Sequence, residues 1–117
     1  MAAPPWSSPG WSPLTSSAEP DPLAELAALD AIFSALAHPA RRQILLFLQL
    51  RGGALGAGEI AGRFACRWPT ISRHLKVLVA AGLLEVTREG RERRYTLASA
   101  RLTEIPGRWL AWFQESR

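Results

Sequence analysis

The sequence has few of the residues that build covalent or metal-linked structure. Its 117 residues include one cysteine, Cys66, and two histidines, His38 and His74. A single cysteine excludes a disulfide or a thiolate cluster within one chain. Three potential ligands on separate segments disfavour a metal site. We therefore expect no metal and no cofactor, and we expect Cys66 to be a small buried residue.

Long apolar runs are also missing. No stretch reaches the roughly 18 consecutive apolar residues of a membrane-spanning helix. The N-terminus has neither the basic start nor the apolar run of a signal peptide. The sequence therefore predicts a soluble, intracellular protein without a membrane partner.

Basic residues are absent from the beginning of the chain. Residues 1–38 contain four acidic residues and no lysine or arginine, whereas residues 63–101 contain nine lysines and arginines against three glutamates. This asymmetry suggests a polyanionic partner for the basic part. Basic patches are also common on solvated surfaces, so charge alone does not decide between the two.

Proline and serine dominate the N-terminal segment, residues 1–22, which shows no apolar periodicity. Such a segment buries too little surface to offset its chain entropy. We predict a disordered tail over 1–22, a folded domain over 23–113 and a short C-terminal end over 114–117. Trp6 and Trp11 are unusual in such a tail; they either dock on the domain or a partner, or are incidental.

Two predicted helices, 23–38 and 98–113, lie at the ends of the domain and carry apolar residues at 3-4-3 spacing. A proline and a glycine at 106 and 107 should bend or interrupt the second helix. A domain this small cannot cover both apolar seams, so we predict that they pair in a homodimer. The alternative is that both seams lie in the core of a monomer. The seam residues are Leu26, Leu29, Phe33, Leu36, Leu102, Ile105, Trp109 and Trp112.

The segment 67–82 has the pattern of a short two-faced helix. Its apolar residues fall on one helical face. Pro69 suits the first turn, and Gly82 suits the left-handed position after the last turn. The opposite face presents hydroxyl groups and cations, which bind phosphates and base edges. The apolar residues are Ile71, Leu75, Leu78 and Val79, and the polar ones are Thr70, Ser72, Arg73, His74 and Lys76.

Two helices are predicted before this segment, over 39–50 and 58–64. Arg41 and Arg42 at the start of the first oppose the helix dipole, which suggests a use for them unless they are simply solvated. The glycine-rich stretch 52–58 follows a helix and lacks a Gly-Lys-Ser/Thr ending, so it is predicted to be a turn and not a phosphate-binding loop. Helices 58–64 and 67–82 together make a helix-turn-helix.

Residues 83–97 have the alternating pattern of a β-hairpin with a charged tip. A hairpin directly after a helix-turn-helix is a wing. Its arginines are close enough to contact one backbone strand of a duplex, although a solvated hairpin is the alternative. These arginines are Arg88, Arg91, Arg93 and Arg94.

Linked motifs across this domain resemble one known family. They are HPARRQIL at 38–45, GEIA at 58–61, PTISRHLKVL at 69–78 and AGL at 81–83, followed by Gly90-Arg91 before Tyr95. Over about residues 28–113 the chain resembles the ArsR/SmtB family of bacterial winged-helix repressors, nearer to its metal-independent, autorepressor-like branch. The resemblance implies that helix 68–81 enters the major groove, that hairpin 83–97 touches the backbone or minor groove, and that the first and last helices form the dimer. It also implies a bacterial cytoplasmic protein associated with the nucleoid.

The chain departs from the family pattern at several positions. Arg67 and His38 stand where the family commonly has Ser, Thr or Asp as helix caps, so capping should be weaker at both. Trp68 occupies a position that is often polar and faces DNA, and its helical angle favours packing instead. His74 either packs beside the buried stripe or contacts DNA. Metal-sensing members carry Cys-x-Cys in the helix matching 58–64 or ligands in the last helix, and this sequence has neither.

The combined reading is a mainly α-helical winged helix-turn-helix protein with a β-hairpin wing. We predict a homodimeric, sequence-specific transcriptional repressor that binds an inverted-repeat operator in double-stranded DNA. The alternative is a winged-helix module that binds a protein through its tryptophan-rich ends. An enzyme is not expected, because no carboxylate is placed to orient Ser72 and His74. The predicted DNA contacts are Arg67, Thr70, Ser72, Arg73, His74 and Lys76 on the helix and Arg88, Arg91, Arg93 and Arg94 on the wing.

Overall fold

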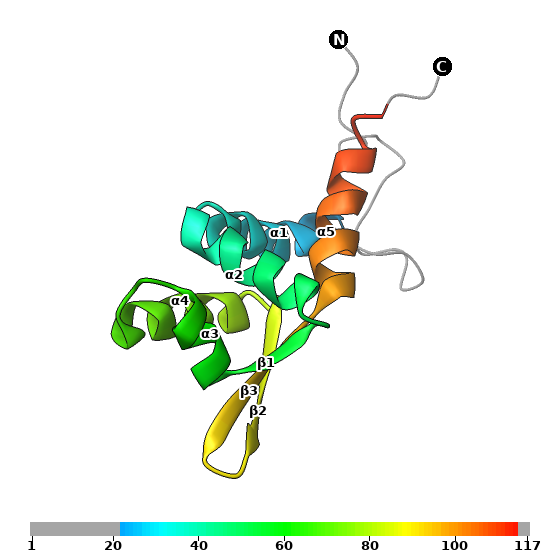
Figure 1. Cartoon of the computed structure of the whole chain (residues 1–117). Helices are drawn as coiled ribbons and strands as arrows, with labels where there is room; N and C mark the ends of the chain where they lie inside the picture. Colours follow the sequence, from blue (N-terminus) through cyan, green and yellow to red (C-terminus); the bar gives the residue numbers. More distant parts are fainter. Residues whose placement is uncertain (1–21, 115–117) are drawn as a thin grey trace, which may run out of the picture.

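A computed structural model describes residues 22–114 of the chain. In this part five helices and three strands follow one another (Figure 1): α1 (Pro22–Leu36), α2 (Pro39–Leu50), β1 (Ala54–Gly56), α3 (Ala57–Arg63), α4 (Trp68–Ala80), β2 (Leu84–Glu89), β3 (Glu92–Leu97) and α5 (Ser99–Ala111). The predicted tail with Trp6 and Trp11 lies outside the described residues, apart from the proline that begins α1.

The wing and the last helix project from opposite ends of the molecule, and α1 to α4 lie beside the line that joins them (Figure 1). The wing is the hairpin of β2 and β3, in which Leu84 pairs with Leu97 and Val86 with Tyr95. This is the alternation that the sequence predicts. The whole sheet is antiparallel in the order β1-β3-β2.

Strand β1 corrects the prediction that 52–58 is only a turn. Gly52 and Gly53 adopt φ of 93° and 95°, a conformation that favours glycine and that turns the chain back after α2. Ala54 to Gly56 then pair with the outer edge of β3. Leu55, the one large apolar residue of this strand, is buried in the core. A strand this short has no detectable period, and it forms because a partner edge is available.

The core lies where α1, α2, α3 and α4 meet the base of the wing. Ile44, Leu45 and Leu48 of α2 are buried, as are Ile60 of α3 and Tyr95 of the wing. Burial of such side chains contributes about 1.5–3 kcal/mol each before chain entropy is subtracted. The side chains that are fully buried are Ile32, Ile44, Leu48, Ile60, Ile71, Leu75, Leu78, Leu83 and Leu84.

The arginines at the start of α2 have a structural use. The guanidinium of Arg41 donates to the carbonyls of Ala35 at 2.7 Å and Ser34 at 3.3 Å, and Arg42 donates to the carbonyl of Leu36 at 2.7 Å. These carbonyls end α1 and have no partner within that helix. The two cations therefore cap α1, which accounts for their unfavourable position on α2.

The cap of α2 differs from the prediction. Nδ1 of His38 accepts a hydrogen bond from the Ala40 backbone N–H at 3.1 Å, so this histidine does cap the helix. A neutral imidazole nitrogen is an acceptor, as an aspartate oxygen would be. Arg67, by contrast, makes no side-chain cap bond at the start of α4, in agreement with the prediction.

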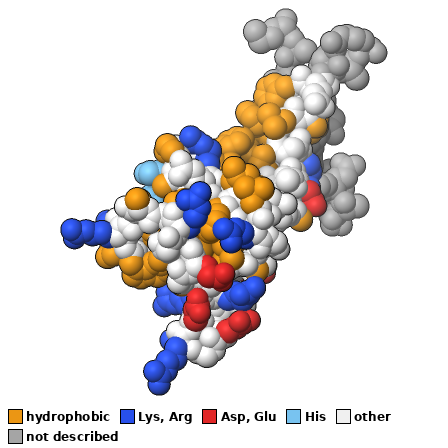
Figure 2. Space-filling view, in the orientation of Figure 1, with side chains coloured by type: hydrophobic (Ala, Val, Ile, Leu, Met, Phe, Trp, Pro, Cys, Tyr) orange, Lys and Arg blue, Asp and Glu red, His pale blue; other side chains and the backbone are white. Residues whose placement is uncertain are grey.

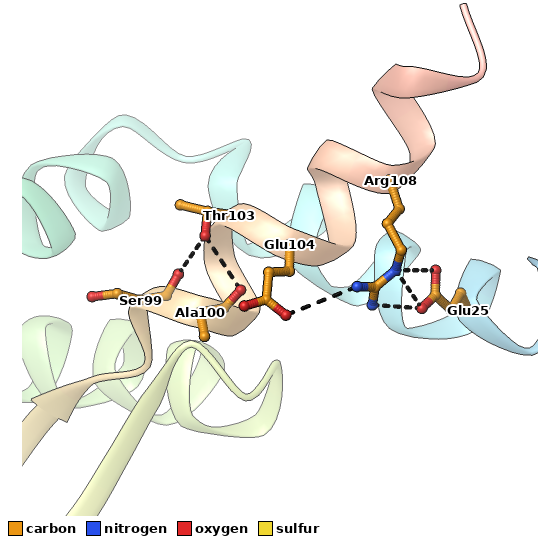
Figure 3. Close-up of polar contacts among 6 residues, drawn as sticks. All are labelled: Glu25, Ser99, Ala100, Thr103, Glu104 and Arg108. Atoms are coloured by element: carbon orange, nitrogen blue, oxygen red, sulfur yellow. Dashed lines mark hydrogen bonds and ion pairs between the residues drawn. The ribbon is translucent and has the colours of Figure 1, made fainter. Parts of the chain in front are cut away.

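Helix α5 packs along α1 and continues through Pro106, so of the two predicted effects, a bend or an interruption, the interruption is wrong. The ring of Phe33 meets that of Trp109 edge-on at 5.4 Å between centroids. Figure 3 shows Arg108 of α5 reaching Glu25 of α1, with Nη2 2.6 Å from Oε2. These contacts join α5 to α1 close to the position where proline leaves one backbone hydrogen bond of the helix unmade.

The end of α4 is joined to α5. Gly82 adopts φ of 78° and its N–H donates to Val79, while Leu83 donates to Leu78, which is the Schellman pattern of a helix C-terminus. Arg101 of α5 then donates from Nε to the carbonyl of Ala81 at 3.0 Å. A cation at this end complements the helix dipole and ties the last helix to α4.

Among residues 22–114, no single helix has the length and apolar composition to cross a bilayer. Helices α1 and α2 meet those criteria only as a pair, and the two are bent by 95° with respect to each other.

Candidate nucleic-acid interface

The helix-turn-helix consists of α3 and α4, joined by an exposed turn. Cys66 lies in this turn and is exposed, contrary to the prediction of a buried cysteine. The turn carries the chain across the surface before α4 enters the core, so its side chains have nothing to pack on. Pro69 occupies the first turn of α4, where its missing N–H leaves no hydrogen bond unmade.

Helix α4 has the two faces that its sequence predicts. Ile71, Leu75 and Leu78 are fully buried. Arg73 and Lys76 are exposed on the other side. The predicted base-contacting hydroxyl residues, Thr70 and Ser72, are half-buried at the margin. The helix thus offers solvent two cations and two hydroxyl groups along its outer side.

Trp68 is placed differently from the prediction that it packs in the core. Its side chain is 40% exposed and lines a hollow between α4 and the wing. Trp68 is the first residue of α4, and the helix reaches the core only from Ile71 onward. Its angle on the helix therefore does not bury it. The outer face of the helix-turn-helix therefore includes a large aromatic ring.

The wing presents its arginines on two faces. Successive side chains of a strand point to opposite sides. Arg88 pairs with Arg93 across the hairpin, and both continue the face that carries Val86 and Tyr95. Arg94 lies on the other face, opposite Thr87, and is half-buried. The structure therefore separates Arg94 from the other wing arginines that the sequence groups together.

A hollow separates the helix-turn-helix from the wing. Its lining joins Trp68 and Ser72 of α4 to Arg88, Arg91 and Arg93 of the wing. Further along, Lys76 and Arg93 face each other across a second depression. Arg67, exposed at the start of α4, lies next to Trp68 in the chain. Figure 2 shows basic side chains over the helix-turn-helix and at the wing tip, and hydrophobic ones gathered along α5.

His74 is a core residue of α4 and not an exposed one. Only 8% of it is exposed, and its ring centroid lies 4.4 Å from that of His38. Its Nδ1 is 3.4 Å from Nη1 of Arg41. Of the two interpretations, packing or DNA contact, packing therefore describes the position of His74. Its neighbours are Arg41 of α2 and His38, which caps that helix. A side chain so covered has little surface left for DNA.

The environment of His74 disfavours its charged form. Burial, reinforced by the charges of His38, Arg41 and Arg73, lowers the pKa of His74 below its usual value of 6.5. In the unfolded chain this histidine takes up its proton near pH 6.5, whereas the folded chain does so only at lower pH. The unfolded state therefore binds more protons as the pH falls through this range.

We expect the free energy of unfolding to decrease as the pH falls below about 6.5. In His74→Gln, which removes the titrating group, this decrease should be much smaller. The measurement is urea unfolding followed by circular dichroism between pH 8 and pH 5. His38→Gln is the control and should retain most of the slope, because burial is the main cause of the shift. Equal slopes in wild type and His74→Gln would contradict the expectation.

The eight predicted dimer residues divide between core and surface in the single chain. Those that are buried are Leu29 and Ile105. Those that are half-buried are Leu36, Leu102 and Trp109. Those that are exposed are Leu26, Phe33 and Trp112. Because α1 and α5 pack on each other within one chain, part of each seam is used there and part stays exposed. The dimer itself stays a prediction.

Between residues 22 and 114, no three histidine, cysteine, aspartate or glutamate side chains come together in a way that could hold a metal ion.

Together the fold and the basic face define a winged helix-turn-helix protein. Residues 36–87 match a family model described as a helix-turn-helix domain. Over 86 residues the chain is 38% identical to the HTH-type transcriptional repressor SmtB of Mycobacterium tuberculosis, covering 74% of this chain and 62% of that protein. Over 69 residues it is 38% identical to the transcriptional repressor SdpR of Bacillus subtilis, covering 59% of this chain and 74% of that one.

Solved structures show the same likeness. An ArsR-like transcriptional regulator from a Rhodococcus species superposes with a TM-score of 0.66 at 31% identity, covering 78% of this chain and 87% of the other. The chain belongs to the ArsR/SmtB family of winged-helix transcriptional regulators. It spans less than two thirds of the length of the mycobacterial relative. The alternative of a protein-binding module is not favoured by relatives that are named as repressors.

Proposed function

We propose that the protein is a sequence-specific DNA-binding repressor that acts as a homodimer on an inverted-repeat operator. The observation that carries this proposal is that two neighbouring elements expose cations: Arg73 and Lys76 on the outer face of α4, and the wing arginines that line the hollow beside it together with Glu89 and Glu92. A duplex backbone is the polyanion that two such neighbouring basic surfaces fit. A protein with the proposed activity acts at the nucleoid, in the bacterial cytoplasm.

Within this proposal the outer face of α4 reads bases. Arg73 is the cation nearest to the middle of that face, and arginine makes bidentate hydrogen bonds to guanine in the major groove. Thr70 and Ser72 supply hydroxyl groups at the margin. Phosphates are held by Arg67 at the start of α4 and by Lys76 in its second half. These contacts set the position of α4 along the duplex.

The wing contributes phosphate contacts from Arg88, Arg91 and Arg93. Arg94 was predicted to act with them, and its position on the other face gives it at most an indirect part in the same contact. His74 was also predicted as a contact, and its burial supports a role in holding α4 in place instead. The exposed cations of α4 and the wing include neither Arg94 nor His74.

The exposed parts of α1 and α5 supply the two-fold contact. A surface strip of leucine and aromatic side chains is typical of a protein interface, and a two-fold arrangement pairs such a strip with its own copy. Two copies then present two recognition helices about one turn of DNA apart, near 34 Å. Occupation of a promoter by this dimer would exclude polymerase.

The proposal is tested by selecting bound fragments from genomic DNA, beginning with the region upstream of the protein's own gene. Saturable, salt-sensitive binding to a few fragments that share an inverted repeat is the expected result. Binding to none, or equal binding to all at physiological salt, would reject sequence-specific recognition. Footprinting then shows whether the protected region holds two half-sites.

Arg91→Ala separates wing contacts from base reading. Arg91 is exposed at the tip of the wing, so its loss should weaken binding to operator and random DNA alike. The slope of log K against log salt should become shallower by about one unit, because about one phosphate contact is lost. Titrations at several salt concentrations measure both effects. A loss confined to the operator would assign Arg91 to base reading instead.

A further inference from the structure

Glu92 joins the wing to the helix-turn-helix. It is the first residue of β3, directly after the turn of the hairpin. Its Oε1 accepts a hydrogen bond from the backbone N–H of Gly58, in the first turn of α3, at 3.2 Å. The contact connects β3 to α3, two elements whose bonded residues are 34 positions apart in the sequence.

The chemistry of the contact is that of a helix cap supplied from a distance. The first N–H groups of a helix have no partner within it, and a carboxylate there is further favoured by the helix dipole. Glu59, within α3, accepts from the Gly56 N–H at 3.1 Å. Glu92 serves a different N–H, so the two carboxylates complement each other at the same helix end.

A glycine leaves room for this carboxylate. A Cβ added to Gly56 would overlap the carboxylate of Glu92, whereas one added to Gly58 would lie 3.6 Å from Oε1, an ordinary contact. The backbone of Gly56 has φ of −74°, which any residue adopts. A side chain at position 56 would therefore displace the flexible end of Glu92, although the backbone conformation of Gly56 would allow it.

The hairpin alone does not favour Glu92. It stands directly opposite Glu89 across the wing, and like charges in such pairs destabilise a hairpin. Its bond to α3 offsets this cost. The bond also closes one end of the hollow, because Gly58 and Glu92 both line it.

We propose that Glu92 is a positioning residue that fixes the angle of the wing relative to α4. Through its bond to α3, Glu92 keeps Arg88, Arg91 and Arg93 turned toward the same side as the recognition helix. This role rests on the proposed function, because the angle of the wing affects binding only when DNA contacts both. Loss of the bond frees the part of the hairpin that extends beyond its pairing with β1 at Arg94.

The sharpest test is Gly56→Ala, which displaces the Glu92 carboxylate while every charge of the protein stays in place. In the free protein, residual dipolar couplings of the wing amides, referred to those of α4, should change, and hydrogen exchange at the Gly58 amide should become at least about tenfold faster. Affinity for DNA should fall about threefold to tenfold. Gly58→Ala is the matched control and should change neither the couplings nor the affinity. A thermal melt checks that each variant is folded.

Glu92 itself is tested by two substitutions. Glu92→Gln retains the acceptor oxygen and should keep the wild-type couplings, whereas Glu92→Ala should reproduce those of Gly56→Ala. The double variant Gly56→Ala/Glu92→Ala should be no worse than Glu92→Ala alone, because both changes break one contact. Glu89→Ala controls for charge: removal of a negative charge near DNA by itself strengthens binding, so Glu92→Ala should bind at least about threefold more weakly than Glu89→Ala.

Unchanged wing couplings in Gly56→Ala and Glu92→Ala would overturn the role of Glu92. So would altered couplings with unchanged DNA affinity in Gly56→Ala. If the wild-type chain binds no DNA, the proposed function fails instead, and the couplings of the free protein alone decide whether Glu92 sets the angle of the wing.

Discussion

Leu26→Glu is expected to convert the protein into a monomer at micromolar concentration and to lower operator affinity by at least about a hundredfold. Leu26 is 36% exposed and lines an apolar hollow with Trp109 and Trp112 between α1 and α5. A carboxylate forced into an apolar interface loses its hydration and finds no partner there, at a cost of several kcal/mol. Without a second subunit, the chain also loses the gain from binding two half-sites at once.

Sedimentation and titration of a two-half-site operator measure the two effects. Leu50→Glu is the matched control: Leu50 is 73% exposed at the end of α2, away from this hollow, so the same change should leave both dimer and affinity intact. Binding of Leu26→Glu to a single half-site should stay close to that of the wild type. An unaltered dimer in Leu26→Glu would show that α1 and α5 do not form the two-fold contact.

Arg73→Ala is expected to cost about 1–3 kcal/mol on the operator, roughly 5- to 150-fold in affinity, with a much smaller loss on random DNA. The guanidinium lies on the exposed side of α4, and its removal leaves the buried stripe beneath it unchanged. The preference of the protein for one base pair in each half-site should disappear. Titration against operators substituted at each position identifies that base pair.

Arg51→Ala controls for the loss of one positive charge. Arg51 lies at the end of α2 over the ring of Phe47 and outside the hollow that α4 and the wing enclose. This variant should bind all sequences nearly as the wild type does. Equal losses on operator and random DNA for Arg73→Ala would transfer this residue from base reading to phosphate contact.

The fold is largely predictable because most of its signals are local. The stripe of α4 follows from apolar spacing within a dozen residues, and Pro69 and Gly82 limit the helix from positions inside or beside it. The wing follows from alternation and a charged turn. Each of these signals comes from residues that are close to one another in the sequence. The structure confirms the helix and the hairpin that they predict.

The features that the sequence does not predict depend on distant partners. Strand β1 forms on an edge that the chain supplies only at β3. Trp68 is 40% exposed although its angle on α4 favours packing, because the cover it receives depends on elements from other parts of the chain. Arg94 differs from Arg93 only in the face of the strand it occupies, which the pairing register decides. Glu92 gives no sequence signal as a cap, because the helix it serves lies 34 positions away.

The hydrogen bond from Arg101 to the end of α4 has a consequence for regulation. The beginning of α5 is bonded to the end of α4 through Arg101. In the proposed dimer, the exposed side of α5 contacts the other subunit. A tilt of α5 would then change the distance between the two recognition helices of the dimer. The distance between the two half-sites of an inverted repeat is fixed. A small molecule or modification that reorients α5 is then expected to weaken operator binding without contacting the DNA.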